Sequence, residues 1–327
     1  MEIRILRAKD VHALLPMPEC IDLMARTMSA VSEGRVVLPL RSVMVMPGDL
    51  GMLGNMPGYL SEPECFGVKL VSLIPRNKPP HHSSHLGLVL LFEVEHGQPV
   101  AILDAAEITA IRTAAASGLA TRLLARPDAS DLAILGAGEQ ASSHLSAMLA
   151  VRQLRRVRVW ARNPIKAEAF AKAEGAKHKI TIEVAKTPCD AVTNADIICT
   201  VTKAREPILL GDWIEPGAHL NVVGSSIATA SEIDIATVVK SRFFVDYRSS
   251  TITEGGDYLK ALRAGAITPA HILAEIGQVA NGSRPGRTAS NDITLYKSLG
   301  IAPQDLASAH YVLQKAKEHG VGQMIDF

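Results

Sequence analysis

The chain has 327 residues, 47% of them hydrophobic, which is enough for two domains with separate cores. Its 34 basic and 33 acidic residues give a formal net charge of +1 without a basic block, so neither nucleic acid nor an anionic membrane is expected as a main partner. No apolar run approaches the roughly 18 residues of a membrane span, and the first residues lack a secretory core. The cysteines are scattered without C-x-x-C spacing, which predicts reduced thiols and a cytoplasmic location.

The first third of the chain predicts an α+β domain rich in strands. Ile21, Met24, Met28 and Val31 recur at helical spacing and predict a helix over residues 20–31. Residues 75–84 (PRNKPPHHSS) are proline-rich and polar and predict a loop. Strands are predicted at residues 3–6, 42–46, 51–55, 67–73, 86–93 and 100–104. A helix rich in small residues follows, beginning at Asp104 or Thr109 and ending at Leu124.

Residues 131–163 contain the clearest motif. An apolar run at 132–135 leads into a G-x-G-x-x-A turn, then a helical stretch, then a second apolar run at 157–160. This strand, turn, helix and strand order is the context that the dinucleotide-binding fingerprint requires. A glycine allows the tight turn, a second lets the backbone approach a pyrophosphate, and the helix start offers free N–H groups. The predicted cofactor contacts here are Gly136, Ala137, Gly138, Glu139 and Gln140. A plain tight turn remains the alternative.

The end of the second strand bears on the cofactor. An acidic residue there suits the free ribose 2′-hydroxyl of NAD(H), whereas an arginine suits the 2′-phosphate of NADP(H). Arg162 and Asn163 follow Trp160-Ala161, without an acid. We therefore expect NADP(H) to be preferred, with NAD(H) as the alternative. An exposed loop arginine without a ligand is the competing interpretation of Arg162.

The rest of the chain continues the alternation. Helices are predicted at residues 165–174 and 190–194, strands at 180–184, 197–201, 220–223 and 243–246, and a last helix with residues 306–316 as its clearest part. Alternation at this length predicts an α/β fold with a Rossmann doubly wound parallel sheet, in addition to the N-terminal α+β domain.

Several blocks together resemble the ornithine cyclodeaminase/mu-crystallin family over nearly the whole chain. They are ITAIRTAA at 108–115, GAGEQASSH at 136–144, VWARN at 159–163, EPIL at 206–209, PGAHLNVVGSS at 216–226 and TLYKSLGIAPQDLASA at 294–309. The resemblance implies a substrate-binding and dimerisation domain at 1–118 plus 300–327, around a Rossmann domain at 119–299. It also implies a homodimer.

This family includes ornithine cyclodeaminases, archaeal alanine dehydrogenases and reductases of cyclic ketimines. Cyclodeaminases carry an Asp-rich sequence where this chain has Ala161-Arg162-Asn163, and a catalytic Asp where it has Ser226. Both departures favour an NADPH-dependent reductase of Δ1-pyrroline-2-carboxylate or Δ1-piperideine-2-carboxylate. The alternatives are an ornithine cyclodeaminase with bound NAD, an alanine dehydrogenase-like enzyme, and a crystallin-type binding protein without turnover.

The resemblance also implies the substrate site. Arg41, Lys69 and Arg112 match cations that hold a substrate carboxylate, and Lys69 matches the catalytic residue. A lysine within an apolar strand is costly unless it is partnered or functional, and a pKa lowered by neighbouring cations would let Lys69 supply a proton. The alternative for Lys69 is a solvent-facing edge-strand lysine, and for Arg112 a structural ion pair. The further cofactor contacts that the resemblance implies are Ser84, His85, Arg112, Thr113, Asn163, Thr202, Val223, Ser226 and Ser298.

The histidine cluster is not expected to bind a metal, and His85 is expected only as a cofactor contact. His81, His82 and His85 lack accompanying carboxylates or cysteines at ligand spacing, so no metal site is predicted. His144, in the helix after the glycine-rich turn, is interpreted as a surface or packing residue.

Overall fold

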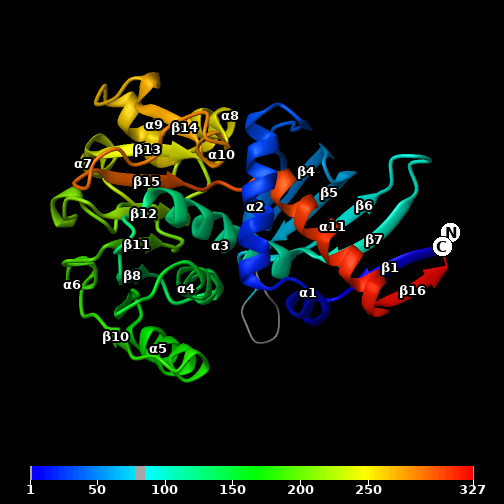
Figure 1. Cartoon of the computed structure of the whole chain (residues 1–327), viewed down its shortest axis with the longest axis horizontal. Coiled ribbons are helices and arrows are strands. Elements are labelled where there is room, and N and C mark those ends of the chain that lie inside the picture. The colour runs from blue at the N-terminus through cyan, green and yellow to red at the C-terminus, as the bar shows by residue number, and fades with distance from the viewer. Residues whose placement is uncertain (1, 78–84, 327) are drawn as a thin grey trace. The chain divides into compact units, whose positions relative to one another are not determined.

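The computed structural model describes residues 2–77 and 85–326, which form two compact units (Figure 1). Unit 1 comprises Met1–Arg112 and Ile301–Phe327, and unit 2 comprises Thr113–Gly300. The first boundary lies within helix α3 (Ala105–Leu124), earlier than the expected change at residues 118–119. Because α3 is continuous across the boundary between Arg112 and Thr113, no turn or loop in the sequence marks where unit 2 begins.

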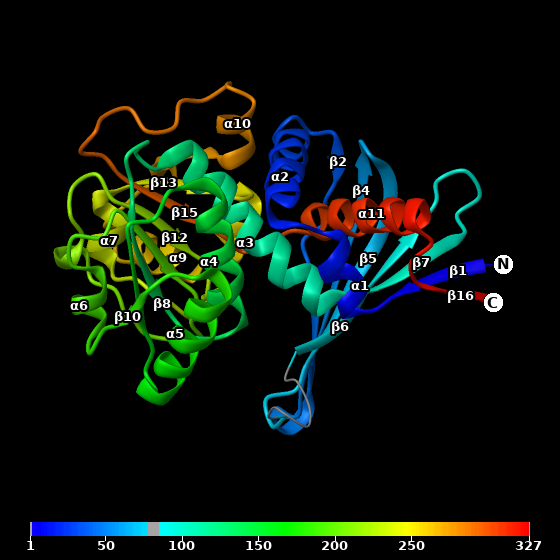
Figure 2. The ribbon, with the colours of Figure 1, turned by 60° about the horizontal axis from the view of Figure 1, so that its bottom comes forward.

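Unit 1 is built on a mixed sheet with the strand order β16-β1-β7-β6-β5-β4-β2, and β3 pairs with β4. Strands β1 and β7 are parallel, and the other described pairings of this sheet are antiparallel. The two ends of the chain pair with each other in β1 and β16, as Figure 2 shows. The strands are β1 (Glu2–Leu6), β2 (Val36–Val37), β3 (Ser42–Met46), β4 (Gly51–Ser61), β5 (Glu64–Leu73), β6 (His85–Phe92), β7 (Pro99–Asp104) and β16 (Gln323–Asp326).

Helices α1 (Ala8–Leu14), α2 (Met17–Ser32) and α11 (Ala302–His319) complete unit 1. Helix α2 buries Ile21, Met24, Met28 and Val31, the residues whose spacing predicted it. Helix α11 packs on β4, β5 and β6 and against α2 (Figure 1). Its first turn contains Pro303, which fits a helix start because the missing N–H would have no partner there.

Two glycines allow α11 to approach the sheet closely. Gly58 on β4 and Gly67 on β5 are direct cross-strand partners. A Cβ atom at Gly58 would lie 3.2 Å from Leu306 Cδ1, and one at Gly67 would lie 3.1 Å from Leu306 Cδ2. Both distances are shorter than ordinary carbon contacts of about 3.5–4.0 Å, so the Leu306 side chain would have to move. At Gly67 the neighbouring strand is the stricter limit, because a Cβ there would lie 2.2 Å from the Leu90 carbonyl oxygen.

Unit 2 is a doubly wound parallel sheet with the order β10-β9-β8-β11-β12-β15-β13-β14, in which each described pairing is parallel. The chain first moves outward from β8 to β9 and β10, then returns to the other side of β8 with β11 and β12. This reversal is the arrangement of a Rossmann fold, and the predicted fold class is confirmed. The strands are β8 (Asp131–Leu135), β9 (Arg156–Trp160), β10 (Ile182–Val184), β11 (Ile197–Thr200), β12 (His219–Val222), β13 (Ser241–Val245), β14 (Ile272–Glu275) and β15 (Ile293–Lys297).

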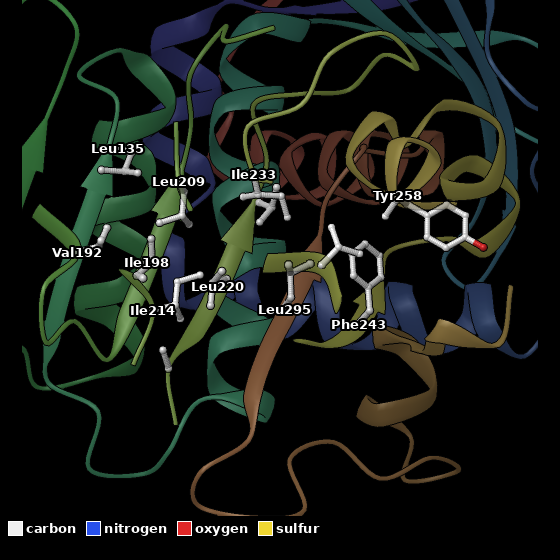
Figure 3. Packing of buried hydrophobic residues seen from close by; sticks show 14 of the residues in the cluster. Leu135, Val192, Ile198, Leu209, Ile214, Leu220, Ile233, Phe243, Tyr258 and Leu295 are labelled. Carbon is white, nitrogen blue, oxygen red and sulfur yellow. The ribbon is translucent and has the colours of Figure 1, made fainter. Parts of the chain in front are cut away.

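Helices cover both faces of this sheet. On one face, Leu135, Ile198, Leu220 and Leu295 pack with side chains of α6, α7 and α9 in a buried cluster (Figure 3). Burial of each such side chain stabilises the fold by about 1.5–3 kcal/mol. On the other face, Asn221 donates a hydrogen bond to Thr121 of α3, beside Met148 of α4. The helices are α4 (Glu139–Val151), α5 (Pro164–His178), α6 (Pro188–Val192), α7 (Ile235–Lys240), α8 (Arg248–Glu254), α9 (Gly256–Arg263) and α10 (Ile276–Ala280).

Some elements differ from the sequence prediction. The third strand of unit 2 begins at Ile182 instead of residue 180, and α6 begins at Pro188 instead of residue 190. Strand β15 was not predicted, because its buried Thr294 and Lys297 interrupt the apolar pattern expected of a central parallel strand. Among the described residues, no helix has the length and apolarity needed to cross a membrane.

Candidate active site

Lys69 lies on β5, an interior strand with β4 on one side and β6 on the other. Only 3% of its surface is exposed. Because alternate residues of a strand share a face, Lys69 lies on the same face as Gly67, which α11 covers. The alternative of a solvent-facing lysine on an edge strand is therefore wrong.

Asp305, in the first turn of α11, is shared between two cations. Its Oδ2 atom lies 2.8 Å from Lys69 Nζ, and its Oδ1 atom accepts a hydrogen bond of 2.9 Å from Arg112 Nε. Arg112 also donates to Gln304 Oε1 at 2.6 Å, and Lys69 donates to Thr109 Oγ1 at 3.4 Å. The Asp305 side chain is fully buried and those of both cations nearly so. The two cations and one carboxylate leave a net positive charge in this group.

Burial lowers the pKa of Lys69 from 10.5 to about 8. Asp305 opposes this by favouring the charged ammonium, while the positive charges of Arg112 and Arg41 lower the pKa further. Arg41 lies directly before β3 and is partly exposed. Its guanidinium acts electrostatically on Lys69, so unit 1 gathers all three expected substrate-binding cations. A lysine with this pKa can hold or release a proton near neutral pH.

The glycine-rich turn of unit 2 connects β8 to α4. Gly136 has a φ of +132°. A Cβ there would lie 2.8 Å from the carbonyl oxygen of Val201, which directly follows the neighbouring strand β11. Gly138 directly precedes α4, and a Cβ there would meet no atom within 4 Å. The space in front of Gly138 is therefore open, as a turn that receives a pyrophosphate requires. Ala137, Glu139 and Gln140 complete the turn and the start of α4.

Two of the expected cofactor contacts contain buried polar atoms without a partner. Gln140 Oε1 and Ser298 Oγ have no hydrogen-bond partner within the described part of the chain. An unsatisfied buried polar atom costs about 1–3 kcal/mol, so both atoms are suited to a ligand that supplies the missing partner. The residues present thus fit a dinucleotide.

The carboxyl ends of β11, β12 and β15 bring other expected contacts to one edge of the sheet. These three strands are neighbours. Thr202, Val223, Ser226 and Ser298 each follow one of them. Ligands of open parallel sheets bind at this edge, beside the point where the strand order reverses.

Thr113 is buried in α3. His85 is the first residue of β6, whereas Ser84, His81 and His82 lie outside the described residues.

Arg162 and Asn163 follow β9 at the same edge. Arg162 is exposed and makes no hydrogen bond or ion pair with the described residues. Asn163 has a structural role as the N-cap of α5, since its Oδ1 accepts hydrogen bonds of 3.0 and 3.4 Å from Ile165 and Lys166. Arg162 thus remains available to a ligand, while Asn163 holds the start of α5.

Sequence reasoning missed Asp305, although it lies within a quoted family block. The signal was the acid itself, early in α11, which becomes informative once Lys69 needs a buried counterion. His144 was predicted to be a surface or packing residue; it is fully buried and forms a 2.9 Å hydrogen bond with Ser117 Oγ, so it is a packing residue and not a surface one. Among the described residues, no group of three or more His, Cys, Asp or Glu side chains could hold a metal ion.

Comparison with known proteins identifies the family. The model of the ornithine cyclodeaminase/mu-crystallin family matches residues 1–320. The chain belongs to this family. The resemblance drawn from the motifs is therefore confirmed.

Three relatives are similar over most of their length. The ketimine reductase mu-crystallin of Mus musculus is 38% identical over 280 residues, 86% of this chain and 85% of the mouse protein. A solved structure of Thermococcus litoralis Δ1-pyrroline-2-carboxylate reductase with NADH and L-proline has 37% identity, a TM-score of 0.95, and coverage of 98% of this chain and 99% of its own. An archaeal alanine dehydrogenase dimer with bound NAD has 29% identity, a TM-score of 0.93 and full coverage of both chains. The expectation of an oxidoreductase, rather than a binding protein without turnover, is confirmed.

The shared carboxylate predicts how an Asp305→Asn substitution changes Lys69. Loss of the negative charge removes the main effect that favours the ammonium form, so the pKa of Lys69 is expected to fall by about 1 to 3 pH units below that of the wild type. The measurement is an NMR titration of ¹³Cε-labelled lysines, with Lys69→Met used to assign the resonance.

Asp212→Asn is the matched control, because Asp212 pairs with the exposed Lys240 at 2.7 Å in unit 2. It should leave the Lys69 titration unchanged. A folded Asp305→Asn variant with the wild-type pKa at Lys69 would contradict the proposed role of Asp305.

Proposed function

We propose that this chain uses a reduced nicotinamide dinucleotide to convert Δ1-pyrroline-2-carboxylate to L-proline, with Δ1-piperideine-2-carboxylate and pipecolate as a second pair. The observation that supports this most strongly is the buried group of Lys69, Arg112 and Asp305, which combines a net positive charge with a lysine pKa of about 8. The relatives named above include two reductases of this type, one of them solved with NADH and L-proline.

The cations of unit 1 bind the substrate carboxylate in this proposal. Arg112 presents a guanidinium whose Nε and Nη1 atoms are held by Asp305 and Gln304, so its orientation is fixed before substrate arrives. Arg41 adds a second guanidinium that is partly exposed. Each charge-assisted hydrogen bond to a carboxylate contributes about 1.5–3 kcal/mol net.

Lys69 supplies the proton in this proposal. A cyclic imine accepts a hydride more readily when its nitrogen is protonated, and the bound cofactor supplies that hydride. Lys69 Nζ carries a proton below about pH 8 and can donate it to the imine nitrogen directly or through water. Asp305 holds Nζ in place and keeps enough of the lysine protonated near neutral pH.

Cyclodeamination of ornithine is less well supported. By the family resemblance, Ser226 stands where cyclodeaminases have their catalytic acid, and residues 224–230 contain no Asp or Glu. Glu232, the next acid along the chain, accepts hydrogen bonds from Thr200, Thr202 and Gly224 and is fully buried. It is therefore poorly placed to act as a base.

The decisive assay follows oxidation of NADPH and NADH with each of the two imines, alongside ammonia release from ornithine and from alanine with the oxidised cofactors. We expect imine-dependent oxidation and no ammonia from ornithine. Ammonia release without imine reduction would overturn the proposal. Lys69→Met should lower kcat/KM for the imine by about 10²–10⁴-fold, because the proton donor and one positive charge of the proposed substrate site are lost. NADPH should still bind, because the glycine-rich turn of unit 2 is unchanged. Lys240→Met, which removes an exposed lysine, is the control and should retain activity.

We further propose that NADP(H) is the preferred cofactor, because Arg162 is exposed after β9 and no acid accompanies it. Arg162→Ala should weaken NADPH binding by about 10- to 100-fold, the equivalent of about 1.5–3 kcal/mol, and leave NADH binding nearly unchanged. Calorimetric titration with both nucleotides measures this. Arg155→Ala, at the opposite end of β9, should change neither affinity, and equal losses for both nucleotides in Arg162→Ala would argue against the preference.

We propose that the protein is a cytoplasmic homodimer. The four cysteines are free thiols, and one of the relatives is a dimer. Strand β3 exposes Val43, Met44 and Val45 to 47, 58 and 70%. A contiguous apolar edge of this kind is a typical contact surface.

Val45→Asp should therefore shift the protein toward the monomer in analytical ultracentrifugation, because a charge in an apolar interface loses its hydration. Ile252→Asp alters a residue of similar character on α8, exposed to 49%, and should not change the mass. A Val45→Asp protein that remains wholly dimeric would place the interface elsewhere.

A further inference from the structure

Glu232 joins the segments that follow β11 and β12. Within the described chain, four donors reach its carboxylate. Oε1 accepts from the backbone N–H and the hydroxyl of Thr202, both at 2.7 Å. Oε2 accepts from the Thr200 hydroxyl at 2.8 Å and the Gly224 N–H at 2.6 Å. The side chain is fully buried and lies between these two segments.

The packing around Glu232 leaves little freedom. A Cβ atom at Gly224 would lie 2.1 Å from the Thr202 carbonyl oxygen and 2.4 Å from Glu232 Oε1, so only glycine fits between them. The Thr202 hydroxyl also accepts a hydrogen bond of 3.1 Å from the Ala204 N–H. These contacts fix the backbone on both sides of Thr202 and Val223.

A second buried acid holds Glu232 itself. Asp257 Oδ1 accepts hydrogen bonds from the backbone N–H groups of Glu232 and Ile233 at 2.8 and 3.2 Å. Its Oδ2 atom pairs with Lys297 Nζ at 2.7 Å, and that ammonium also donates to the Ser225 carbonyl oxygen at 2.6 Å. Lys297 directly precedes Ser298. One buried network therefore reaches the carboxyl ends of β11, β12 and β15.

We propose that Glu232 is a positioning residue that holds Thr202 and Val223 where the nicotinamide half of the cofactor binds. This inference rests on the proposed use of a nicotinamide dinucleotide, and it concerns a residue that need not touch the cofactor. The pyrophosphate is assigned to the turn after β8 and the 2′-phosphate of the adenine half to Arg162. Among the described residues, neither this turn nor Arg162 forms a hydrogen bond with Glu232. Removal of Glu232 should therefore affect the two halves of the ligand differently.

The carboxylate form is required for a geometric reason. A backbone N–H donates to each of the two oxygens, and the Gly224 N–H also lies 3.2 Å from the Thr200 carbonyl oxygen. An amide of the same size would place its NH₂ group against one of these donors in either orientation. Burial raises the pKa of Glu232, while its hydrogen bonds and the charge of Lys297 act in the opposite direction. Glu232→Gln thus disrupts the network with almost no change in volume.

The test compares two ligands by calorimetry: NADPH, and adenosine 2′,5′-bisphosphate, which lacks the nicotinamide half. In Glu232→Gln we expect the Kd for NADPH to rise at least about tenfold, and the Kd for the bisphosphate to change less than about twofold. Circular dichroism and thermal melting confirm folding. An unchanged Kd for NADPH in a folded variant, or equal weakening of both ligands, would overturn the inference.

Asp196→Asn is the matched control. Asp196 also accepts two backbone N–H groups, from Ser130 and Asp131 at 2.9 and 3.0 Å, but it lies at the amino end of β11. This variant should not weaken the binding of NADPH more than that of the bisphosphate. If it does, the selective effect is not specific to Glu232, and the inference is contradicted. If Glu232→Gln does not fold, Thr200→Val removes one donor to Oε2 with little change in shape and must show the same selectivity.

This experiment separates the inference from the proposed function. A wild-type protein that binds NADPH but reduces neither imine would refute the proposed reaction. The role of Glu232 would still be decided by the Kd values for NADPH and for the bisphosphate in Glu232→Gln. A wild-type protein that binds no dinucleotide would overturn both.

Discussion

The buried carboxylate of Asp305 is the interaction on which the charged group of unit 1 depends. Lys69 and Arg112 are both almost completely buried, and Asp305 lies between them with one oxygen on each. Without a counterion, two cations at this depth would lose their hydration and repel each other, and removal of one partner of a buried pair costs about 3–5 kcal/mol. Because one carboxylate serves two cations, a positive charge remains. The proposed binding of an anionic substrate depends on that surplus.

Unit 2 uses buried acids in a different way. Asp257 and Glu232 accept hydrogen bonds mainly from backbone N–H groups and hydroxyls, and the shape of the loops depends on them. The open edge of a parallel sheet consists of chain segments that lack the ladder of hydrogen bonds present within the strands. A buried carboxylate replaces part of that ladder. The loops gain fixed positions in this way.

Much of this architecture could be predicted from sequence. The glycine-rich turn, the strands around it and helix α2 are encoded by residues close together in the chain, and these predictions agree with the structure. Lys69 stood out because a charge interrupts an apolar strand. Its partner could not be predicted in the same way, since Asp305 is far along the chain and becomes relevant only when α11 packs on β5. Strand β15 and the network of Glu232 were missed for the same reason. The charge of Lys297 interrupts the apolar pattern expected of a central strand, and its buried partners Asp257 and Ser225 lie far from it in the sequence.

The pairing of β1 with β16 and the packing of α11 on β4 and β5 have a consequence for biosynthesis. Unit 1 is completed by the last residues of the chain, whereas unit 2 is continuous. A ribosome therefore releases the strand that carries Lys69 long before it releases the acid that compensates that charge. Domains generally fold as units during translation, so unit 2 can fold while the sheet of unit 1 still lacks its covering helix. Until then the face of β4 and β5 that contains Gly58 and Gly67 lacks the helix that packs on it, and transiently exposed apolar surface of this kind favours aggregation.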